Sequence, residues 1–317
     1  MQMRRLGRTG PTIMPIVFGG NVFGWTVDEA TSFALLDAFV DHGFDAIDTA
    51  DVYSRWFPGN QGGESETIIG RWLKARPGMR ERVRIFTKVG MDLGGEGRQG
   101  LSPRWIAEAV EGSLRRLGTD RIDLYFAHKF DPETPQSETL GAFDALVRAG
   151  KVLSVGASNF DAPQLREALD ISSRDGLARY EVIQPEYNLY GRGSFEGPLR
   201  DLCLSEEIGV VPYYALASGF LTGKYRSKDD LGQSVRGQRV GTYFDARGMA
   251  ILGALDEVAA AHDATCAEVA LAWLMARQGV TAPIASGTRP AHIETFARSA
   301  ALDLTASEQA RLDSAGA

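Results

Sequence analysis

The amino-acid sequence predicts a parallel α/β fold, a (β/α)8 TIM barrel, on three observations. Eight short apolar or β-branched runs are spread along the 317 residues. Longer amphipathic runs separate them, and the repeat of about thirty residues is that of one βα unit. Such alternation predicts a parallel sheet covered by helices, and eight units close into a barrel. No Pro/Ser-rich or low-complexity segment divides the chain, so we expect one domain over residues 1–317.

The expected strands are short runs rich in Val, Ile, Leu and Phe. They are Ile16–Phe18, Phe44–Ile47, Val83–Phe86, Ile122–Phe126, Val152–Val155, Val182–Ile183, Val210–Val211 and Ala282–Ile284. The longest interval precedes the eighth strand. It holds a Gly-rich polar loop, residues 227–241, and two helices at about 248–262 and 265–277. We interpret this interval as an insertion into the barrel.

The segment from Ser102 to Leu117 illustrates the expected helices. Its apolar residues recur at spacings of three and four, which is typical of an amphipathic helix. Ser102 suits the N-cap, Pro103 the first turn and Gly118 the end. Leu140, Phe143 and Val147 repeat the pattern before Gly150. Capping-box spacing is present at Thr26–Glu29, Thr265–Glu268 and Thr305–Glu308.

Composition excludes several classes of protein. The chain is 44% hydrophobic and 24% charged, which is typical of a globular protein and not of a disordered one. Its net charge of −7, without a basic cluster, argues against nucleic-acid and anionic-membrane partners. Two cysteines, Cys203 and Cys266, indicate a reducing compartment. With no secretory h-region and no membrane-length apolar run, we expect a cytoplasmic monomer or weak homo-oligomer.

Polar side chains follow the expected strands at the end where barrel enzymes place their active sites. They are Gly19–Asn21, Asp48, Lys88, His128, Ser158 with Asn159, Gln184, Tyr213 and Ser286, with Tyr53 five residues after Asp48. Each alone has an ordinary structural explanation, such as a capping residue or a packed histidine. Their joint placement at successive strand ends favours a functional site.

Four of these residues form a candidate proton-transfer unit. Tyrosine has an ordinary pKa of about 10, and a neighbouring ammonium lowers it by favouring the phenolate. Lys88 is the candidate ammonium, with Asp48 as its counter-ion, because a buried lysine requires a partner. We therefore expect Lys88 to lower the pKa of Tyr53. His128 would bind a substrate carbonyl or share the proton relay.

Several segments together resemble the aldo-keto reductases. They are Phe44–Tyr53 (FDAIDTADVY), Ile85–Lys88, Leu124–His128, Val155–Phe160, Ile183–Asn188 and Leu221–Tyr225, in the family's order along the whole chain. The Leu-Thr-Gly-Lys-Tyr segment is most similar to the bacterial and potassium-channel β-subunit branches. The resemblance implies a β-hairpin near Met3–Ile13 below the barrel. It also implies reversible hydride transfer between a nicotinamide and an aldehyde or ketone, with Tyr53 as general acid.

The same resemblance implies where the cofactor binds. Gly20, Asn21, Val22 and Asp48 would line it, and Ser158, Asn159 and Gln184 would bind the carboxamide. Tyr213 would stack on the nicotinamide ring. The pyrophosphate would lie along Leu216, Ser218, Gly219, Leu221 and Lys224, and the ribose 2′-phosphate near Ser286, Thr288, Arg289 and His292. NADPH is the favoured cofactor, with NADH as the alternative; no metal is expected.

Aromatic residues after the expected strands are candidates for a substrate pocket. They are Trp25, Trp56, Phe57 and Phe130, with Phe244 as a further candidate. Aromatic walls beside a cofactor favour apolar carbonyl compounds. The alternative is that these side chains pack the barrel rim.

One decoy motif and two alternative functions compete with a reductase. Gly95-Glu-Gly-Arg-Gln-Gly100 fits G-x-G-x-x-G. A dinucleotide fingerprint requires a strand directly before its first glycine and a helix that begins within the motif, and this segment has neither. A Schiff-base aldolase would use Lys88 as nucleophile. A regulatory subunit would bind NADPH and turn over slowly.

Overall fold

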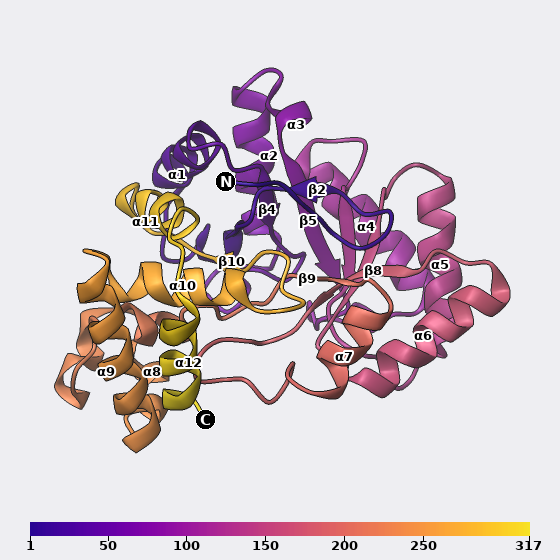
Figure 1. The fold of residues 1–317 in the computed structure, drawn as a ribbon. Coiled ribbons are helices and arrows are strands. Elements are labelled where there is room, and N and C mark those ends of the chain that lie inside the picture. The colour runs from indigo at the N-terminus through magenta and orange to yellow at the C-terminus, as the bar shows by residue number, and fades with distance from the viewer.

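A computed structural model describes residues 1–317 and shows eight parallel strands surrounded by helices (Figure 1). The strands are β3 (Val17–Gly19), β4 (Ala46–Asp48), β5 (Arg84–Val89), β6 (Leu124–Ala127), β7 (Val155–Ser158), β8 (Tyr180–Gln184), β9 (Gly209–Val210) and β10 (Ile284–Ala285). They are joined in the order β10-β3-β4-β5-β6-β7-β8-β9. Backbone bonds from Thr281 N to Val210 O and from Ile284 N to Pro212 O, both 2.8 Å, close the ring. The predicted (β/α)8 barrel is confirmed.

The expected hairpin is also present. β1 (Arg4–Arg5) pairs antiparallel with β2 (Thr12–Ile13). Leu6 and Ile13 belong to the apolar cluster of 11 residues inside the barrel, so the hairpin closes one end of it. The backbone N–H groups of Arg8 and Thr9 donate to the Glu181 carboxylate at 2.6 and 3.1 Å, which fixes the hairpin against β8.

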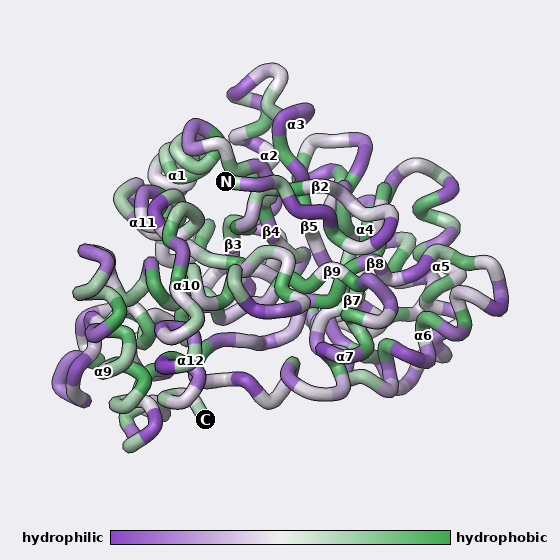
Figure 2. Tube along the Cα trace, viewed as in Figure 1, coloured by the Kyte–Doolittle hydropathy of each residue, from purple (hydrophilic) through white to green (hydrophobic).

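Helices cover the outside of the sheet. They are α1 (Glu29–Asp41), α2 (Glu64–Ala75), α3 (Met79–Arg82), α4 (Pro103–Leu117), α5 (Gln136–Arg148), α6 (Ala162–Asp175), α7 (Pro198–Ser205), α8 (Gly237–Val240), α9 (Ala246–Ala261), α10 (Cys266–Ala276), α11 (Ala291–Ser299) and α12 (Ala306–Ala315). Figure 2 shows hydrophilic and hydrophobic residues alternating along outer helices such as α5 and α6. Their apolar faces and the outer face of the sheet form one core cluster of 75 buried residues.

Helix α4 follows its predicted boundaries. The Ser102 side chain accepts from Trp105 N, Pro103 is the first helical residue, and Gly118 ends the helix at φ +64°. The capping boxes at Thr265 and Thr305 are present as predicted. No helix combines the length and apolarity needed to cross a membrane.

Three local predictions were wrong. The fifth strand is β7, Val155–Ser158, because Val152 makes only an isolated bridge to Ile122 and the ladder with β8 begins at Val155. Helix α1 is capped by Asp28, whose carboxylate accepts from Thr31 N at 2.8 Å, and not by Thr26.

The third error concerns the insertion before β10. Its polar segment is not an open loop, because residues 228–233 and 241–243 form 3-10 turns and residues 237–240 form α8. Gly237 allows this segment to fold back closely on itself, because a Cβ at this position would lie 1.8 Å from Leu231 O. The two predicted helices are present as α9 and α10, within two residues of the expected bounds.

Candidate active site

Four predicted residues converge at one end of the barrel because each follows or ends a parallel strand. Asp48 is the last residue of β4 and Lys88 lies near the end of β5. His128 comes directly after β6. Tyr53 is carried by the turn after β4, which is fixed where the Ser54 hydroxyl donates to Phe23 O at 2.5 Å.

The Lys88 ammonium is the centre of this group. It is fully buried and donates to Asp48 Oδ2 at 2.6 Å, to Thr49 O at 2.8 Å and to Tyr53 OH at 2.9 Å. The Tyr53 hydroxyl donates to Asp48 Oδ2 at 3.2 Å, and Gln184 Nε2 donates to Asp48 Oδ1 at 3.0 Å. The buried carboxylate and ammonium therefore compensate each other's desolvation, as buried ions require.

Protonation in this site differs from one expectation. Burial, reinforced by the Asp48 carboxylate, raises the pKa of Tyr53 well above its ordinary value. The prediction that Lys88 lowers this pKa is wrong, because burial of the phenol, reinforced by the Asp48 carboxylate, raises it instead. Tyr53 is consequently a protonated phenol, the form that a proton donor needs.

Burial also acts on the two nitrogen bases of the site. It lowers the pKa of Lys88, although Asp48 opposes the shift. Burial, with the Lys88 charge second, lowers the pKa of His128 well below its ordinary range. His128 is therefore a neutral imidazole whose ring lies 6.1 Å, centroid to centroid, from the Tyr53 ring, and its Nδ1 is buried without a partner.

The residues predicted for the carboxamide form a second hydrogen-bonded group. Asn159 Nδ2 donates to His128 O at 2.9 Å and to Ser158 Oγ at 3.1 Å. The Tyr213 hydroxyl donates to Asn159 Oδ1 at 2.7 Å. Gln184 joins this group to the first one, because its backbone carbonyl accepts from the Ser158 hydroxyl at 2.9 Å while its Nε2 donates to Asp48 Oδ1. The structure thus brings together residues from β7, β8 and the segment after β9.

The segment predicted for the pyrophosphate has an unusual backbone. Ala217, Ser218 and Gly219, in the 3-10 turn Ala217–Thr222, have φ values of +47°, +58° and +98°. A Cβ on Gly219 would lie 3.5 Å from Lys224 Nζ, so the loop folds back on this cation. Leu216 is half-buried at the start of the turn, whereas the Leu221 side chain is buried in the core.

Among the candidate phosphate ligands, Arg289 and His292 are in contact, and the charge of Lys224, which lies far earlier in the chain, acts on the same imidazole. Arg289 Nη2 lies 3.2 Å from His292 Nε2, and Thr288 N donates to His292 Nδ1 at 3.1 Å. Burial, Arg289 and Lys224 in that order lower the pKa of His292. This group has the positive charge that an anionic ligand would require.

One cation was missed by sequence reasoning. Arg236, from the insertion, has its guanidinium 5.1 Å from the Trp25 ring centroid and forms no ion pair with an acidic side chain. With the Asn21 amide oriented to satisfy its neighbours, its oxygen accepts from Arg236 at 3.2 Å and its nitrogen donates to Ser286 Oγ at 2.7 Å. Asn21 and neighbouring Gly20 and Val22 form a short 3-10 turn. No motif marks Arg236, because its place depends on how the insertion folds back.

The predicted substrate residues divide into two groups. Trp25 packs edge-on against Trp56 at 5.5 Å, and Trp56 lies 6.0 Å from the Tyr53 ring. Phe57 beside them is 43% exposed. The other two pack in the protein, since Phe130 lies against Phe160 and Phe244 against Phe220.

The rejected dinucleotide motif lies in a loop. Strand β5 ends at Val89 and α4 begins at Pro103, so Gly95–Gly100 touches neither a strand end nor a helix start. No group of three or more His, Cys, Asp or Glu side chains is arranged to hold a metal ion.

The closed barrel therefore carries a buried Asp–Lys pair, a half-buried Tyr53 beside it and a neutral histidine at its strand ends, which is the arrangement of a barrel enzyme that transfers a proton. A sequence model of the Aldo/keto reductase family matches residues 15–317. The chain therefore belongs to the aldo/keto reductase family and is an oxidoreductase.

Three relatives illustrate its position in the family. It is 35% identical to an uncharacterized oxidoreductase, YrpG, from Bacillus subtilis, over 90% of this chain and 86% of that protein. It is 32% identical to the aldo-keto reductase yakc [NADP(+)] of Schizosaccharomyces pombe, over 86% and 78%. It is 30% identical to a probable voltage-gated potassium channel subunit beta from Arabidopsis thaliana, over 93% and 89%. The predicted resemblance is thereby confirmed.

Proposed function

We propose that this protein reversibly reduces an aldehyde or ketone to an alcohol with NADPH, using Tyr53 as general acid and base. The observation that carries the proposal is the Tyr53 hydroxyl, which lies 2.9 Å from Lys88 Nζ and 3.2 Å from Asp48 Oδ2 at the strand ends of the barrel. A reduced nicotinamide, when bound, supplies a hydride. The chain's own residues then have to supply and control a proton.

The proton comes from Tyr53. Its raised pKa keeps the phenol protonated until a substrate oxygen accepts the proton. As the phenolate forms, the Lys88 ammonium already donates to that oxygen and stabilises its charge without reorganising. Asp48 and Thr49 O hold the ammonium in place. In the oxidation direction the same phenolate removes the alcohol proton.

His128 would orient the carbonyl. Because the imidazole is neutral, it offers one N–H to a substrate oxygen and introduces no second cation beside Lys88. Its ring lies edge-on to Tyr53, so both side chains face the same region. Asn159 Nδ2 donates a hydrogen bond to the backbone oxygen of His128 and so fixes the position of the histidine.

The cation placement supports NADPH over NADH. Lys224 and Arg236 would bind the pyrophosphate, and Arg289 and His292 the ribose 2′-phosphate, with Ser286 and Thr288 beside them. Arg289 lies against His292 and the Lys224 charge acts on the same imidazole, and none of the three pairs with an acidic side chain, which supports the fit. Ser158, Asn159 and Gln184 have the amide and hydroxyl groups for a carboxamide, and Tyr213 is half-buried and hydrogen-bonded to Asn159.

The proposed substrate is a small apolar carbonyl compound. Trp25 and Trp56 form an aromatic wall that reaches the Tyr53 ring, and Phe57 extends it. Aromatic walls with few polar groups favour apolar ligands. Phe130 contributes less, because it packs on Phe160.

The test is Tyr53→Phe, assayed by NADPH oxidation with a panel of aldehydes and ketones. Loss of the general acid should lower kcat by roughly 10²–10⁴-fold, while NADPH binding measured by fluorescence stays within about twofold. Trp25→Phe is the matched control, since it keeps an aromatic wall and the proton donor. Turnover by Tyr53→Phe at the wild-type rate would refute the mechanism.

Two alternatives make different predictions. A Schiff-base nucleophile must be a neutral amine that substrate can reach, whereas Lys88 is fully buried and donates three hydrogen bonds. Borohydride trapping of a carbonyl compound on Lys88 would restore that alternative. The channel-subunit relative favours the second alternative, a regulatory subunit. Tight NADPH binding with less than one turnover per minute on the whole panel would support it.

A further inference from the structure

The first turn of α2 carries two polar residues that the proposed mechanism does not use. They are Ser65 and Glu66, and both side chains are fully buried. Successive residues of a helix point about 100° apart, so the two side chains reach different strands. A buried polar group is costly unless its hydrogen bonds are made. Both residues make theirs to the segments that surround the Lys88 ammonium.

Ser65 joins two strand ends through one hydroxyl group. Its Oγ accepts from Thr49 Oγ1 at 2.8 Å and donates to Gly20 O at 2.8 Å. Thr49 directly follows β4, and Gly20 directly follows β3. The approach is close, because a Cβ on Gly20 would lie 3.0 Å from Ser65 Oγ. Removing the Ser65 hydroxyl would therefore leave a buried donor and a buried acceptor without partners.

Thr49 matters to the reaction site because its carbonyl oxygen accepts from the Lys88 ammonium at 2.8 Å. Its backbone N–H donates to Phe86 O at 2.8 Å, which continues the pairing of β4 with β5. Its side chain makes one hydrogen bond, the one to Ser65. Ser65 consequently fixes the residue that supplies one of the three partners of the ammonium.

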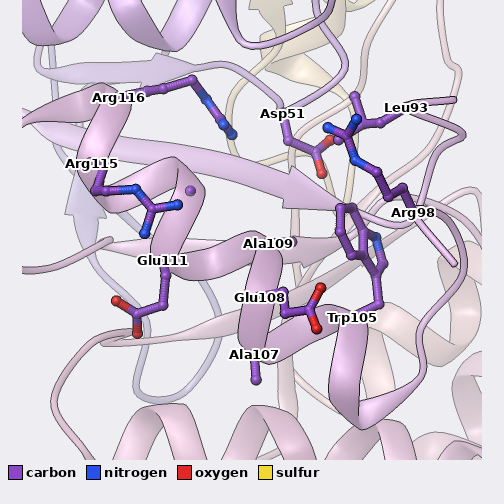
Figure 3. A pocket seen from close by; sticks show the side chains of 11 residues that line it. Asp51, Leu93, Arg98, Trp105, Ala107, Glu108, Ala109, Glu111, Arg115 and Arg116 are labelled. Carbon is purple, nitrogen blue, oxygen red and sulfur yellow. The ribbon is translucent and has the colours of Figure 1, made fainter. Parts of the chain in front are cut away.

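Glu66 fixes the neighbouring strand from the same helical turn. Its Oε1 accepts from Thr87 Oγ1 at 2.6 Å, and its Oε2 accepts from Arg116 Nε at 2.7 Å. Thr87 is the residue before Lys88 in β5. A pocket of about 550 Å³ lies beside this contact, and Figure 3 shows Arg116 and Asp51 at its wall. Hydrogen bonds from α2, and not only apolar packing, therefore hold the strand ends beside this open space.

We propose that Ser65 is a positioning residue for the reaction, because it fixes the Thr49 carbonyl that accepts from the Lys88 ammonium. Through Gly20, it also ties this carbonyl to the turn of the proposed cofactor site. An ammonium that stabilises a phenolate without reorganising has to be held in place before the proton moves. The inference rests on the proposed function, since it concerns the same ammonium.

The kinetic test compares Ser65→Ala with Thr49→Val in carbonyl reduction. Both variants break the 2.8 Å hydrogen bond between the two hydroxyls, and Thr49→Val keeps the carbonyl and the shape of the side chain. Each should lower kcat about tenfold, because the ammonium is less well positioned. KM for the carbonyl compound should change less than twofold, since Ser65 is buried behind the strand ends.

Two further variants complete the kinetic test. The double variant should be no more than about twofold slower than Ser65→Ala, because both changes act through one hydrogen bond. Ser172→Ala is the matched control. Ser172 is a buried serine of α6 that also donates to a backbone carbonyl, Ala178 O at 3.1 Å, and its replacement should leave kcat unchanged.

A second measurement needs no turnover and separates positioning from a merely structural role. With the lysines isotope-labelled at the ε-carbon, an NMR titration follows the Lys88 signal, which is identified by its absence from Lys88→Met. A hydrogen bond to the charged form favours that form. Displacing the Thr49 carbonyl should therefore lower the pKa of Lys88 further than burial already does. In Ser65→Ala and Thr49→Val, Lys88 should titrate at lower pH than in the wild type, and the alkaline fall of kcat should move with it.

The other titratable groups around Lys88 stay the same in both variants. They are Asp48 from β4, Asp51 and Tyr53 from the turn after it, Glu66 from α2 and His128 after β6. A change in the Lys88 titration therefore reports on the Thr49 carbonyl.

Three results would overturn the proposal. They are equal kcat values for Ser65→Ala and Ser172→Ala, an unchanged Lys88 titration, and losses that add in the double variant. If Ser65→Ala does not fold, Thr49→Val carries the same test, because it keeps the bond from Ser65 to Gly20 O. A wild-type protein that reduces no carbonyl compound would contradict the proposed function instead, and the Lys88 titration would still decide whether Ser65 positions the ammonium.

Discussion

The buried Lys88–Asp48 pair supports a sharp prediction about stability. Lys88→Met keeps the aliphatic chain and removes the ammonium. It deletes hydrogen bonds of 2.6 Å to Asp48, 2.8 Å to Thr49 O and 2.9 Å to Tyr53. Asp48, which is 1% exposed, then keeps only the donors of Tyr53 and Gln184.

The expected loss follows from what is left behind. Removing one partner of a buried ion pair costs about 3–5 kcal/mol, because the other charge stays buried and uncompensated. Two remaining donors to Asp48 place the loss near the lower end, at about 3 kcal/mol. The double variant Asp48→Asn with Lys88→Met removes the stranded charge. It should therefore be more stable than Lys88→Met alone by at least about 1 kcal/mol.

The assay is urea denaturation at pH 7, followed by far-UV circular dichroism, for the wild type and the three variants of the cycle. Equal m-values would show that the unfolding reactions are comparable. The reasoning is refuted if Lys88→Met costs less than about 1 kcal/mol, or if the double variant loses the sum of both single losses.

Three further predictions test other parts of the structure. Gly70→Ala should lower the free energy of unfolding in urea by more than about 1 kcal/mol, because a Cβ at this position would lie 2.1 Å from Arg116 O. Gly141→Ala, where a Cβ would meet open space, should instead raise the free energy of unfolding by up to about 1 kcal/mol. His292→Ala should weaken NADPH binding at least tenfold more than NADH binding in a fluorescence titration, and equal losses would contradict the 2′-phosphate assignment. Burial raises the pKa of Cys203 to about 12, so the folded protein favours the protonated thiol and its free energy of unfolding falls as pH rises from about 9 to 12. Cys203→Ala should therefore reduce the fall of the melting temperature with pH over this range, and an unchanged pH dependence would contradict the prediction.

The repeat along the chain was sufficient to predict the barrel, because strand runs and amphipathic helices are local patterns. Helix α4 shows the best case, since Ser102, Pro103 and Gly118 each act on the adjacent backbone. Thr26 shows a failure of the same reasoning. Both Thr26 and Asp28 have the chemistry of an N-cap, and only the path of the preceding turn decides that Asp28 is used.

The candidate site could be predicted as far as strand ends determine it. Asp48 and Lys88 lie at the ends of β4 and β5 and His128 comes directly after β6, and parallel strands present these ends on one side of the sheet. The direction of the Tyr53 pKa shift could not be predicted, because it depends on burial and on a 3.2 Å contact with Asp48. Sequence order carries no information on either quantity.

By itself, the sequence determined the fold class, the family resemblance and the identity of the four residues at the centre of the site. Tertiary structure decided what surrounds them: Arg236 over Trp25, Lys224 near enough to His292 for its charge to lower that pKa, and Asp51 without a hydrogen-bond partner. The physical reason is the distance along the chain over which each effect acts. Propensity and periodicity act over a few residues, whereas burial and charge act between groups that only the closed barrel and its folded insertion bring together.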